Sequence, residues 1–229
     1  MGHMTIEIGF IIFPRVQQLD LTGPYEVLAM VPGARVHLVA KTPEPVATAT
    51  GLVLTPTVSF AECPALDVVC VPGGSGVNPL MEDAETLGFL RRQAEGARYL
   101  TSVCTGALVL GAAGLLRGKR ATTHWAAHDL LAALGAIPTQ GRVVRDGNLI
   151  TGGGVTAGID FGLALAAELA DEATAKAIQL HLEYAPAPPF DAGRPETAAP
   201  DILAATRERL AATRREREAI VARITRSEA

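Results

Sequence analysis

Cys104 is the residue of this chain whose position most clearly suggests chemistry. It follows a short β-prone run, 99–103, and precedes an Ala/Leu/Gly run, 107–116, that is poor in β-branched residues. We therefore expect it where a strand turns into a helix. A thiol at a helix N-terminus faces unpaired N–H groups and the positive end of the helix dipole, and both favour the thiolate. Gly106 permits a tight turn of the kind that exposes a nucleophile. The pattern predicts a nucleophilic thiolate; the alternative is a buried cysteine that packs as a small hydrophobe.

Asp20 is the candidate carboxylate. It comes after the near-continuous apolar run 6–13, which is typical of a strand buried on both faces of a parallel sheet. Because Pro24 suits the first turn of a helix, we expect Asp20 in the loop between that strand and that helix. Open α/β sheets bind ligands beyond the carboxyl ends of their strands. The position favours a site residue, with an Asx turn or a helix cap as the alternative.

Two glycine runs also follow predicted strands. Gly73 and Gly74 come after the buried run 67–71 and precede a helix expected from 78 to 95. Glycine lets backbone amides approach a ligand or an anion closely, although neither common phosphate-loop pattern occurs here. The second run, 152–154, follows another apolar arm. We expect both runs to line a pocket.

His124 is a further candidate partner for the thiol. It lies 20 residues after Cys104 in the chain, and a structural histidine beside the only tryptophan is an equally well supported interpretation. The other histidines of the native sequence, His37, His128 and His181, have no second ligand at metal spacing. The sequence therefore predicts no metal site.

The composition predicts one compact α/β domain over 4–185. A chain of 229 residues with 48% hydrophobic and 19% charged residues can bury one substantial core, and its net charge of −4 argues against a nucleic-acid partner. No apolar run reaches membrane-spanning length and no signal peptide is visible, so we expect no membrane association and a cytoplasmic location. Three scattered cysteines suit a reducing compartment. Residues 1–3 resemble a cloning scar.

The remaining segments are predicted to form the scaffold. An Asp-Gly turn between apolar arms predicts a hairpin over 142–151. Strands are also expected at 35–40 and, as an edge piece or hairpin arm, at 51–58. Apolar periodicity predicts helices over 125–134, 156–170 and 172–182.

Residues 186–229 are predicted to form a proline-rich arm and a charged C-terminal helix. The arm, 186–200, contains five prolines and is expected to be extended. The helix over 201–227 has a thin apolar stripe, so we expect it to gain little from packing against its own domain. An arm of 15 residues can reach about 45 Å. These features predict a homodimer in which each tail clasps the other subunit.

Taken together, these residues resemble the DJ-1/PfpI superfamily over 5–185. Within it, the segment 20–26, together with Thr105 after the cysteine, is most similar to the isocyanide hydratase branch. The segments that carry the resemblance are Pro72-Gly73-Gly74, Ser-Val-Cys-Thr-Gly-Ala at 102–107, Thr-Thr-His-Trp at 122–125 and Gly-Gly-Gly-Val-Thr-Ala-Gly-Ile-Asp at 152–160.

The resemblance implies a flavodoxin-like three-layer α/β sandwich with a mostly parallel central sheet and a cysteine nucleophile elbow. It also implies a homodimer without metal or organic cofactor, with Cys104 as nucleophile and Asp20 as its carboxylate partner. Thr105 stands where PfpI-type proteases have a histidine, which disfavours peptidase activity. Asp20 stands where DJ-1 itself has a glutamate, which disfavours glyoxalase or deglycase chemistry.

The predicted function is the conversion of an isocyanide and water to an N-substituted formamide through a thioimidate on Cys104. Asp20 would supply or relay the proton. Backbone amides at Gly73, Gly74 and Thr105 are expected to stabilise the thiolate and the tetrahedral adduct. The segment at Gly153 and Val155 is expected to form the apolar wall of the pocket, with His124 as an auxiliary group.

The alternative function is a cysteine-based sensor or ligand-binding protein. An exposed thiol of low pKa is also prone to oxidation, which suits a redox-responsive protein. The domain further resembles the ligand-sensing half of some AraC-type regulators, but the single charged helix here takes the place of their helix-turn-helix module.

Overall fold

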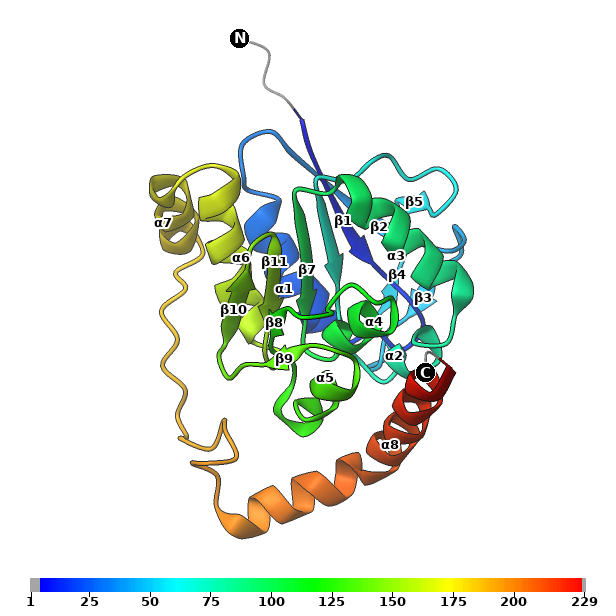
Figure 1. The fold of residues 1–229 in the computed structure, drawn as a ribbon. Coiled ribbons are helices and arrows are strands. Elements are labelled where there is room, and N and C mark those ends of the chain that lie inside the picture. The colour runs from blue at the N-terminus through cyan, green and yellow to red at the C-terminus, as the bar shows by residue number, and fades with distance from the viewer. Residues whose placement is uncertain (1–4, 228–229) are drawn as a thin grey trace.

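A seven-stranded sheet lies at the centre of the protein, as the computed structural model of residues 5–227 shows (Figure 1). Its strand order is β10-β11-β7-β6-β1-β2-β5. Strand β10 pairs antiparallel with β11, and the other five pairings in this sheet are parallel. The strands are β1 (Ile6–Ile11), β2 (Ala34–Ala40), β5 (Val58–Ser59), β6 (Val68–Val71), β7 (Tyr99–Val103), β10 (Val143–Asp146) and β11 (Leu149–Gly152).

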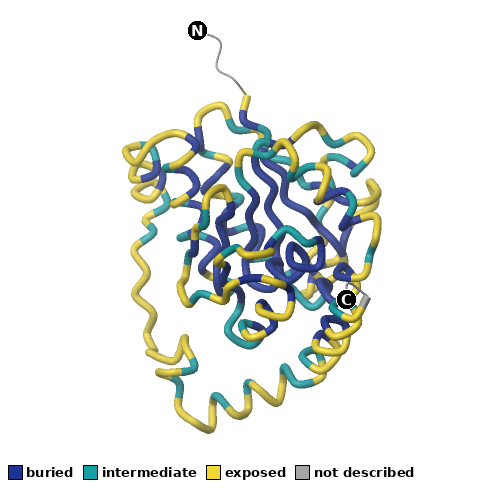
Figure 2. The backbone as a smooth tube through the Cα atoms, viewed as in Figure 1, coloured by how far each residue is buried: buried dark blue, intermediate teal, exposed yellow. Residues whose placement is uncertain are grey.

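Helices cover both faces of this sheet and give three layers. One apolar cluster joins the sheet to α1 (Gln18–Leu28), α6 (Ala157–Leu169) and α7 (Glu172–His181). The other joins it to the remaining helices, and the central strands β1, β6, β7 and β11 between the two clusters are almost wholly buried (Figure 2). The predicted α/β sandwich with a mostly parallel sheet is confirmed. The second cluster contains α2 (Val77–Leu80), α3 (Ala84–Gly96), α4 (Gly106–Ala112), the 3-10 turn η1 (Trp125–Ala127), α5 (Leu130–Ala133) and part of α8 (Pro200–Ser227).

The predicted hairpin is confirmed as β10 and β11. Asp146 pairs with Leu149, so the turn has two residues, and Gly147 takes a left-handed φ of 62° there. Two small sheets lie outside the main one: β3 (Val46–Ala47) with β4 (Val53–Leu54), and β8 (Arg120–Ala121) with β9 (Ile137–Pro138). The region predicted as an edge piece thus contributes both β4 and the edge strand β5.

Three helices are shorter than the sequence pattern predicts. The helix expected over 78–95 is interrupted between α2 and α3, because Asp83 is extended (φ −86°, ψ 99°) and its carboxylate accepts a hydrogen bond from the Thr86 hydroxyl at 2.6 Å. Helix α4 ends at Ala112, just before Gly114 takes a φ of 78°. The helix expected from 125 to 134 is likewise divided into η1 and α5.

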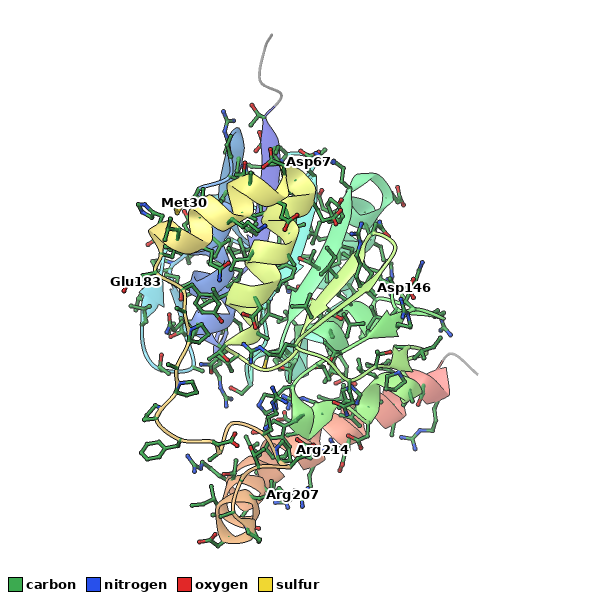
Figure 3. All side chains as sticks on the ribbon, turned by 90° about the vertical axis from the view of Figure 1, so that its left-hand side faces the viewer. Met30, Asp67, Asp146, Glu183, Arg207 and Arg214 are labelled. Carbon is green, nitrogen blue, oxygen red and sulfur yellow. The ribbon has the colours of Figure 1, made fainter. Side chains whose placement is uncertain are left out.

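The C-terminal helix α8 lies partly on the body of its own chain. Ile220 and Val221 are each only 3% exposed and belong to the same apolar cluster as α4, while most of the first half of the helix is exposed (Figure 2). Arg214, labelled in Figure 3, bonds to Asp129 near α5 at 2.8 and 2.5 Å. The expectation that α8 gains little from its own domain is wrong for its second half, since Ile220 and Val221 are buried in the apolar cluster and the helix contacts α2, η1 and α5.

No helix among the described residues is long and apolar enough to cross a membrane. The cloning scar predicted at 1–3 lies outside the described residues.

Candidate active site

Cys104 forms the predicted turn between β7 and α4. Its φ of 55° lies in the left-handed region, which non-glycine residues adopt at a cost of about 1–2 kcal/mol. Hydrogen bonds fix this turn on both sides: the Cys104 N–H donates to Gly152 O at 3.1 Å, and the Thr123 hydroxyl donates to Cys104 O at 2.6 Å. The strained backbone holds the thiol at the end of the sheet.

Gly106 lets α4 approach the neighbouring strand closely. A Cβ built on this residue would lie 1.9 Å from the carbonyl oxygen of Val71 and 2.8 Å from that of Pro72. Both obstacles are backbone atoms, which cannot rotate away as a side chain would. The close approach therefore requires glycine.

Gly106→Ala is expected to destabilise the protein strongly. Relief of the clash must move β6 or α4, and we expect a loss of about 3 kcal/mol, or a fall in Tm of about 6–12 °C. Gly96→Ala is the matched control, because it lies at the end of α3 with no atom within 4 Å of the added carbon. Thermal unfolding of both variants checks this prediction, and an unchanged Tm for Gly106→Ala would contradict it.

Asp20 lies inside α1, in its first turn, and not in the preceding loop. The helix begins earlier than expected because the Gln17 N–H donates to Gly73 O at 2.8 Å and an isolated bridge pairs Val16 with Gly74. These contacts fix the chain just before Gln18. Pro24 consequently lies within the helix, not at its first turn. The Asp20 carboxylate therefore reaches the end of the sheet from the first turn of α1, and not from a loop.

The carboxylate of Asp20 is fully buried and contacts the thiol. Its Oδ2 accepts a hydrogen bond from the Gly73 N–H at 2.9 Å, and the side chain is hydrogen bonded to that of Cys104. Oδ1 is buried without a hydrogen-bond partner among the described residues. Burial raises the pKa of Asp20 to about 7, and the bonds to Gly73 and Cys104 offset only part of that effect.

The pKa of Cys104 is also raised, well above its usual value. Burial is the main cause and the charge of Asp20 adds to it, while the N–H and hydroxyl of Thr105 act in the opposite direction. The expected preference for thiolate at the helix N-terminus is thus outweighed in the closed site. Two groups whose pKa values are both raised hold one proton between them over a broad pH range. The site contains a nucleophile and a proton donor on adjacent atoms.

Gly73 and Gly74 hold this pair in place. The Gly73 N–H is bonded to Asp20, and the Gly74 N–H donates to the Thr105 hydroxyl at 3.1 Å. A Cβ on Gly73 would lie 2.7 Å from Asp20 Oδ2 and 2.6 Å from Thr105 N. Both amides therefore have protein acceptors in this structure, and it is the Thr105 N–H that faces the sulfur.

His124 caps η1 and lies beside Trp125. Its Nδ1 accepts a hydrogen bond from the Ala126 N–H at 3.3 Å, and the two rings are 5.4 Å apart. Burial and the charge of Arg217 lower its pKa. The hydrogen bonds found among the described residues do not join His124 to Cys104 or Asp20.

The second glycine run, 152–154, contributes in two ways. The Gly153 N–H donates to Arg142 O at 2.8 Å, which ties the segment to the hairpin. Val155 packs against the apolar cluster that contains Cys104. A Cβ on Gly154 would lie 3.7 Å from the His124 ring, so this segment borders that histidine.

Several residues around the site were not predicted from the sequence. Thr123 fixes the elbow, and Asn78 accepts a hydrogen bond from the Nε of Arg217 at 3.0 Å. Arg217 lies three and four residues before Ile220 and Val221, so its place on the apolar stripe of α8 is the one signal that pointed to it. Within residues 5–227, no three acidic, histidine or cysteine side chains form a metal-binding cluster.

A cavity of about 400 Å³ lies beside the site and not over the thiol. It separates the first half of α8 from η1 and α5, and its lining includes Trp125, Leu210 and Arg214. Neither Cys104 nor Asp20 lines it.

Comparisons with known proteins show what this chain is similar to. The model of the DJ-1/PfpI family matches residues 7–168. The isonitrile hydratase of Pseudomonas putida is 66% identical over 208 residues, which cover 91% of each chain. The transcriptional regulator GbdR of Pseudomonas aeruginosa is 33% identical over 169 residues, but this chain spans only 45% of its length.

Solved structures give the same result. A ThiJ/PfpI family protein from Pseudomonas syringae superposes with a TM-score of 0.93 and 45% identity over 96% of this chain and 91% of its own. Drosophila melanogaster DJ-1beta gives a TM-score of 0.73 and 26% identity over 80% of this chain and all of its own. The predicted superfamily is confirmed: the chain belongs to the DJ-1/PfpI family.

Proposed function

We propose that this protein hydrates isocyanides to N-substituted formamides. The observation that carries the proposal is the buried pair of Cys104 and Asp20, placed at an elbow in a chain 66% identical to an isonitrile hydratase. The terminal carbon of an isocyanide, R–N≡C, must gain both a nucleophile and a proton. A thiol hydrogen bonded to a carboxyl group supplies both from adjacent atoms.

In the first step the sulfur of Cys104 attacks the terminal carbon. The carboxylate of Asp20 takes the thiol proton and delivers it to the same carbon, which gives a thioimidate, R–N=CH–S–Cys. The N–H of Thr105 faces the sulfur and stabilises negative charge on it while the bond forms. No proton enters from outside in this step.

In the second step water adds to the carbon of the thioimidate. One proton of the water passes to the nitrogen and the other, through Asp20, to the departing sulfur as the carbon–sulfur bond breaks. The products are R–NH–CHO and the free thiol, so the sum of the two steps is isocyanide plus water to formamide. Oδ1 of Asp20 is buried without a hydrogen-bond partner among the described residues, and we expect it to accept a hydrogen bond from that water.

The experiment is incubation of the protein with a simple alkyl isocyanide in H₂O and in D₂O, followed by NMR. We expect the N-substituted formamide, with deuterium on the formyl carbon in D₂O because the thiol proton has exchanged with solvent. Absence of formamide, or a formyl carbon that carries hydrogen in D₂O, would overturn the proposal or its first step respectively.

We also propose that the protein is a homodimer in the cytoplasm, without a nucleic-acid partner. Phe190 in the extended arm and Ile202 in α8 are 79% and 53% exposed, as large apolar side chains that a second copy could cover. Light scattering should give a mass near twice 23.9 kDa. Serine at both positions should shift the mass toward one chain, whereas Leu52→Ser, at an exposed position outside the arm, should not. A single-chain mass for the parent protein would contradict the proposal.

Sensing is the second candidate, and the partial similarity to GbdR favours it. The two candidates differ in turnover. A sensor would bind or react with its ligand at most once per chain, whereas the enzyme should release many equivalents of formamide. The NMR experiment therefore separates them.

A further inference from the structure

The peptide group between Cys104 and Thr105 carries two groups that matter at the elbow. Its carbonyl oxygen accepts the hydrogen bond from the Thr123 hydroxyl at 2.6 Å, and Cys104 and Thr123 are both buried, at 5% and 3% exposed. Because a peptide group is planar and trans, its carbonyl and its N–H point to opposite sides. A hydroxyl that holds the Cys104 carbonyl therefore also sets the direction of the Thr105 N–H.

The Thr105 N–H borders the reacting pair. A Cβ built on Gly73 would lie 2.6 Å from Thr105 N and 2.7 Å from Asp20 Oδ2, so the nitrogen and the carboxylate face the same small space. The Asp20 side chain is hydrogen bonded to the Cys104 thiol, and the Thr105 N–H is hydrogen bonded to the same sulfur. A hydrogen bond from an N–H is stronger to a thiolate than to a thiol, so it favours the charged form.

The left-handed backbone at Cys104 is restrained by one hydrogen bond on each side. The bond from its N–H to Gly152 O, at 3.1 Å, holds the peptide group before the residue, and the Thr123 hydroxyl holds the peptide group after it. Loss of this hydroxyl would leave a buried carbonyl without that donor. The following peptide group could then rotate about ψ of Cys104, and this rotation turns the Thr105 N–H away from the sulfur.

The segment that carries Thr123 is anchored to the strand that also holds the Cys104 N–H. The Thr122 N–H donates to Thr151 Oγ1 at 2.9 Å, in the interior of the protein. The next residue of β11, Gly152, is the acceptor for Cys104. Strand β11 thus holds the elbow directly on one side and through Thr122 and Thr123 on the other.

We propose that Thr123 is a positioning residue for the nucleophile: its hydroxyl holds the Cys104 carbonyl so that the N–H of the same peptide group stays on the sulfur. The inference rests on the proposed function and deepens it, because this N–H stabilises the thiolate that attacks the isocyanide and later leaves the adduct. Thr123 acts through the backbone of the elbow and is not a catalytic residue. Its hydroxyl carries the role, and its methyl group does not.

The test measures the thiol itself, without any isocyanide. The rate at which iodoacetamide alkylates Cys104 is followed from pH 6 to pH 11 by mass spectrometry of its peptide, for the parent, Thr123→Val and Thr123→Ser. Valine has the shape of threonine without the hydroxyl, whereas serine keeps the hydroxyl. We expect the apparent pKa of the thiol to rise by about 1 unit in Thr123→Val, which slows alkylation at pH 8 about tenfold. Thr123→Ser should stay close to the parent.

Thr122→Val is the matched control, because it removes a hydroxyl from the neighbouring buried threonine. That hydroxyl donates to Gly141 O at 3.2 Å and not to the elbow. We expect both valine variants to unfold at a lower temperature than the parent, since each loses a hydrogen bond to a backbone carbonyl. Only Thr123→Val should change the pH profile of alkylation. Asp20, the ionisable side chain that is hydrogen bonded to the thiol, is present in every variant.

An unchanged apparent pKa in Thr123→Val would overturn the inference. So would an equal shift in Thr122→Val, which would indicate a general loosening of the segment, or in Thr123→Ser, which would indicate packing of the methyl group. If Thr123→Val fails to fold, Thr123→Ala, which also lacks the hydroxyl, takes its place with the same expected shift. Since no substrate is used, a failure of isocyanide hydration would leave this result standing.

Discussion

Cys104→Ala is expected to lower isocyanide turnover by more than about a thousandfold while leaving the protein folded. Without the sulfur no thioimidate can form, and no other side chain of the site offers a comparable nucleophile. Alanine has the same Cβ as cysteine, so the left-handed backbone at this position is no more strained than before. The small void should cost about 1 kcal/mol. Formamide production and thermal unfolding, measured on the same preparation, check both parts.

Cys104→Ser is the more specific test of the sulfur, because it replaces the thiol with a hydroxyl of similar size. An alcohol ionises far less readily than a thiol, so turnover should remain as low as in the Ala variant. Parent protein quenched during turnover should carry a substrate-sized adduct on the Cys104 peptide. An adduct on Cys63 or Cys70 instead would contradict the assignment. Neither is expected, because burial raises the pKa of both thiols, to about 11 and about 12, and among the described residues neither is hydrogen bonded to a carboxyl group that could take its proton.

The elbow illustrates what the sequence predicts well. Strand β7 matches the predicted bounds, since a β-prone run and an Ala/Leu/Gly run meet at Cys104 with little ambiguity. The need for Gly106 also follows from a local rule, because a tight turn between strand and helix leaves no room for a side chain. Both signals are contained within about ten residues.

The position of Asp20 could be predicted only in part. That it lies at the carboxyl ends of the strands followed from the α/β pattern. Its place inside α1 did not, because that helix starts where Gln17 and Val16 bond to Gly73 and Gly74, more than 50 residues away in the chain. Long-range backbone contacts of this kind leave no local trace in composition.

The sequence predicted a thiolate at Cys104, whereas the structure raises the pKa of this thiol. The sequence placed Cys104 at a helix N-terminus, which favours the thiolate, but not the complete burial next to a carboxylate that raises the pKa of the thiol. Desolvation depends on everything that packs around a group, including residues far away in the chain. Such effects become visible only when the tertiary structure is known.

Asp20→Asn is expected to reduce turnover at least about a hundredfold, because an amide cannot take the thiol proton and pass it to carbon. Asp20→Glu should be impaired as well, since the longer side chain has no free space in a fully buried position. In the parent, kcat/KM should rise with pH through about 7, as the pair loses the first of its two protons, and should fall only in the alkaline range where the second is lost. If Asp20→Asn keeps near-normal turnover while His124→Ala is inactive, histidine handles the proton and this assignment is wrong.

The same substitution is expected to stabilise the protein at neutral and alkaline pH. The pKa of Asp20 is about 7 in the folded protein against 3.8 for the unperturbed group, so the folded state holds this proton more tightly than the unfolded chain does. Stability from this residue is therefore complete below about pH 4, is lost as the pH rises to about 7, and changes no further above that. A difference of about three units corresponds to about 4 kcal/mol. Asn carries no such proton, and its amide oxygen can still accept the Gly73 N–H. Urea unfolding at pH 4.5, 6 and 8 should show that the free energy of unfolding of Asp20→Asn increases relative to that of the parent as the pH rises. Parallel pH profiles of this free energy for the two proteins would show that Asp20 is not held protonated by burial.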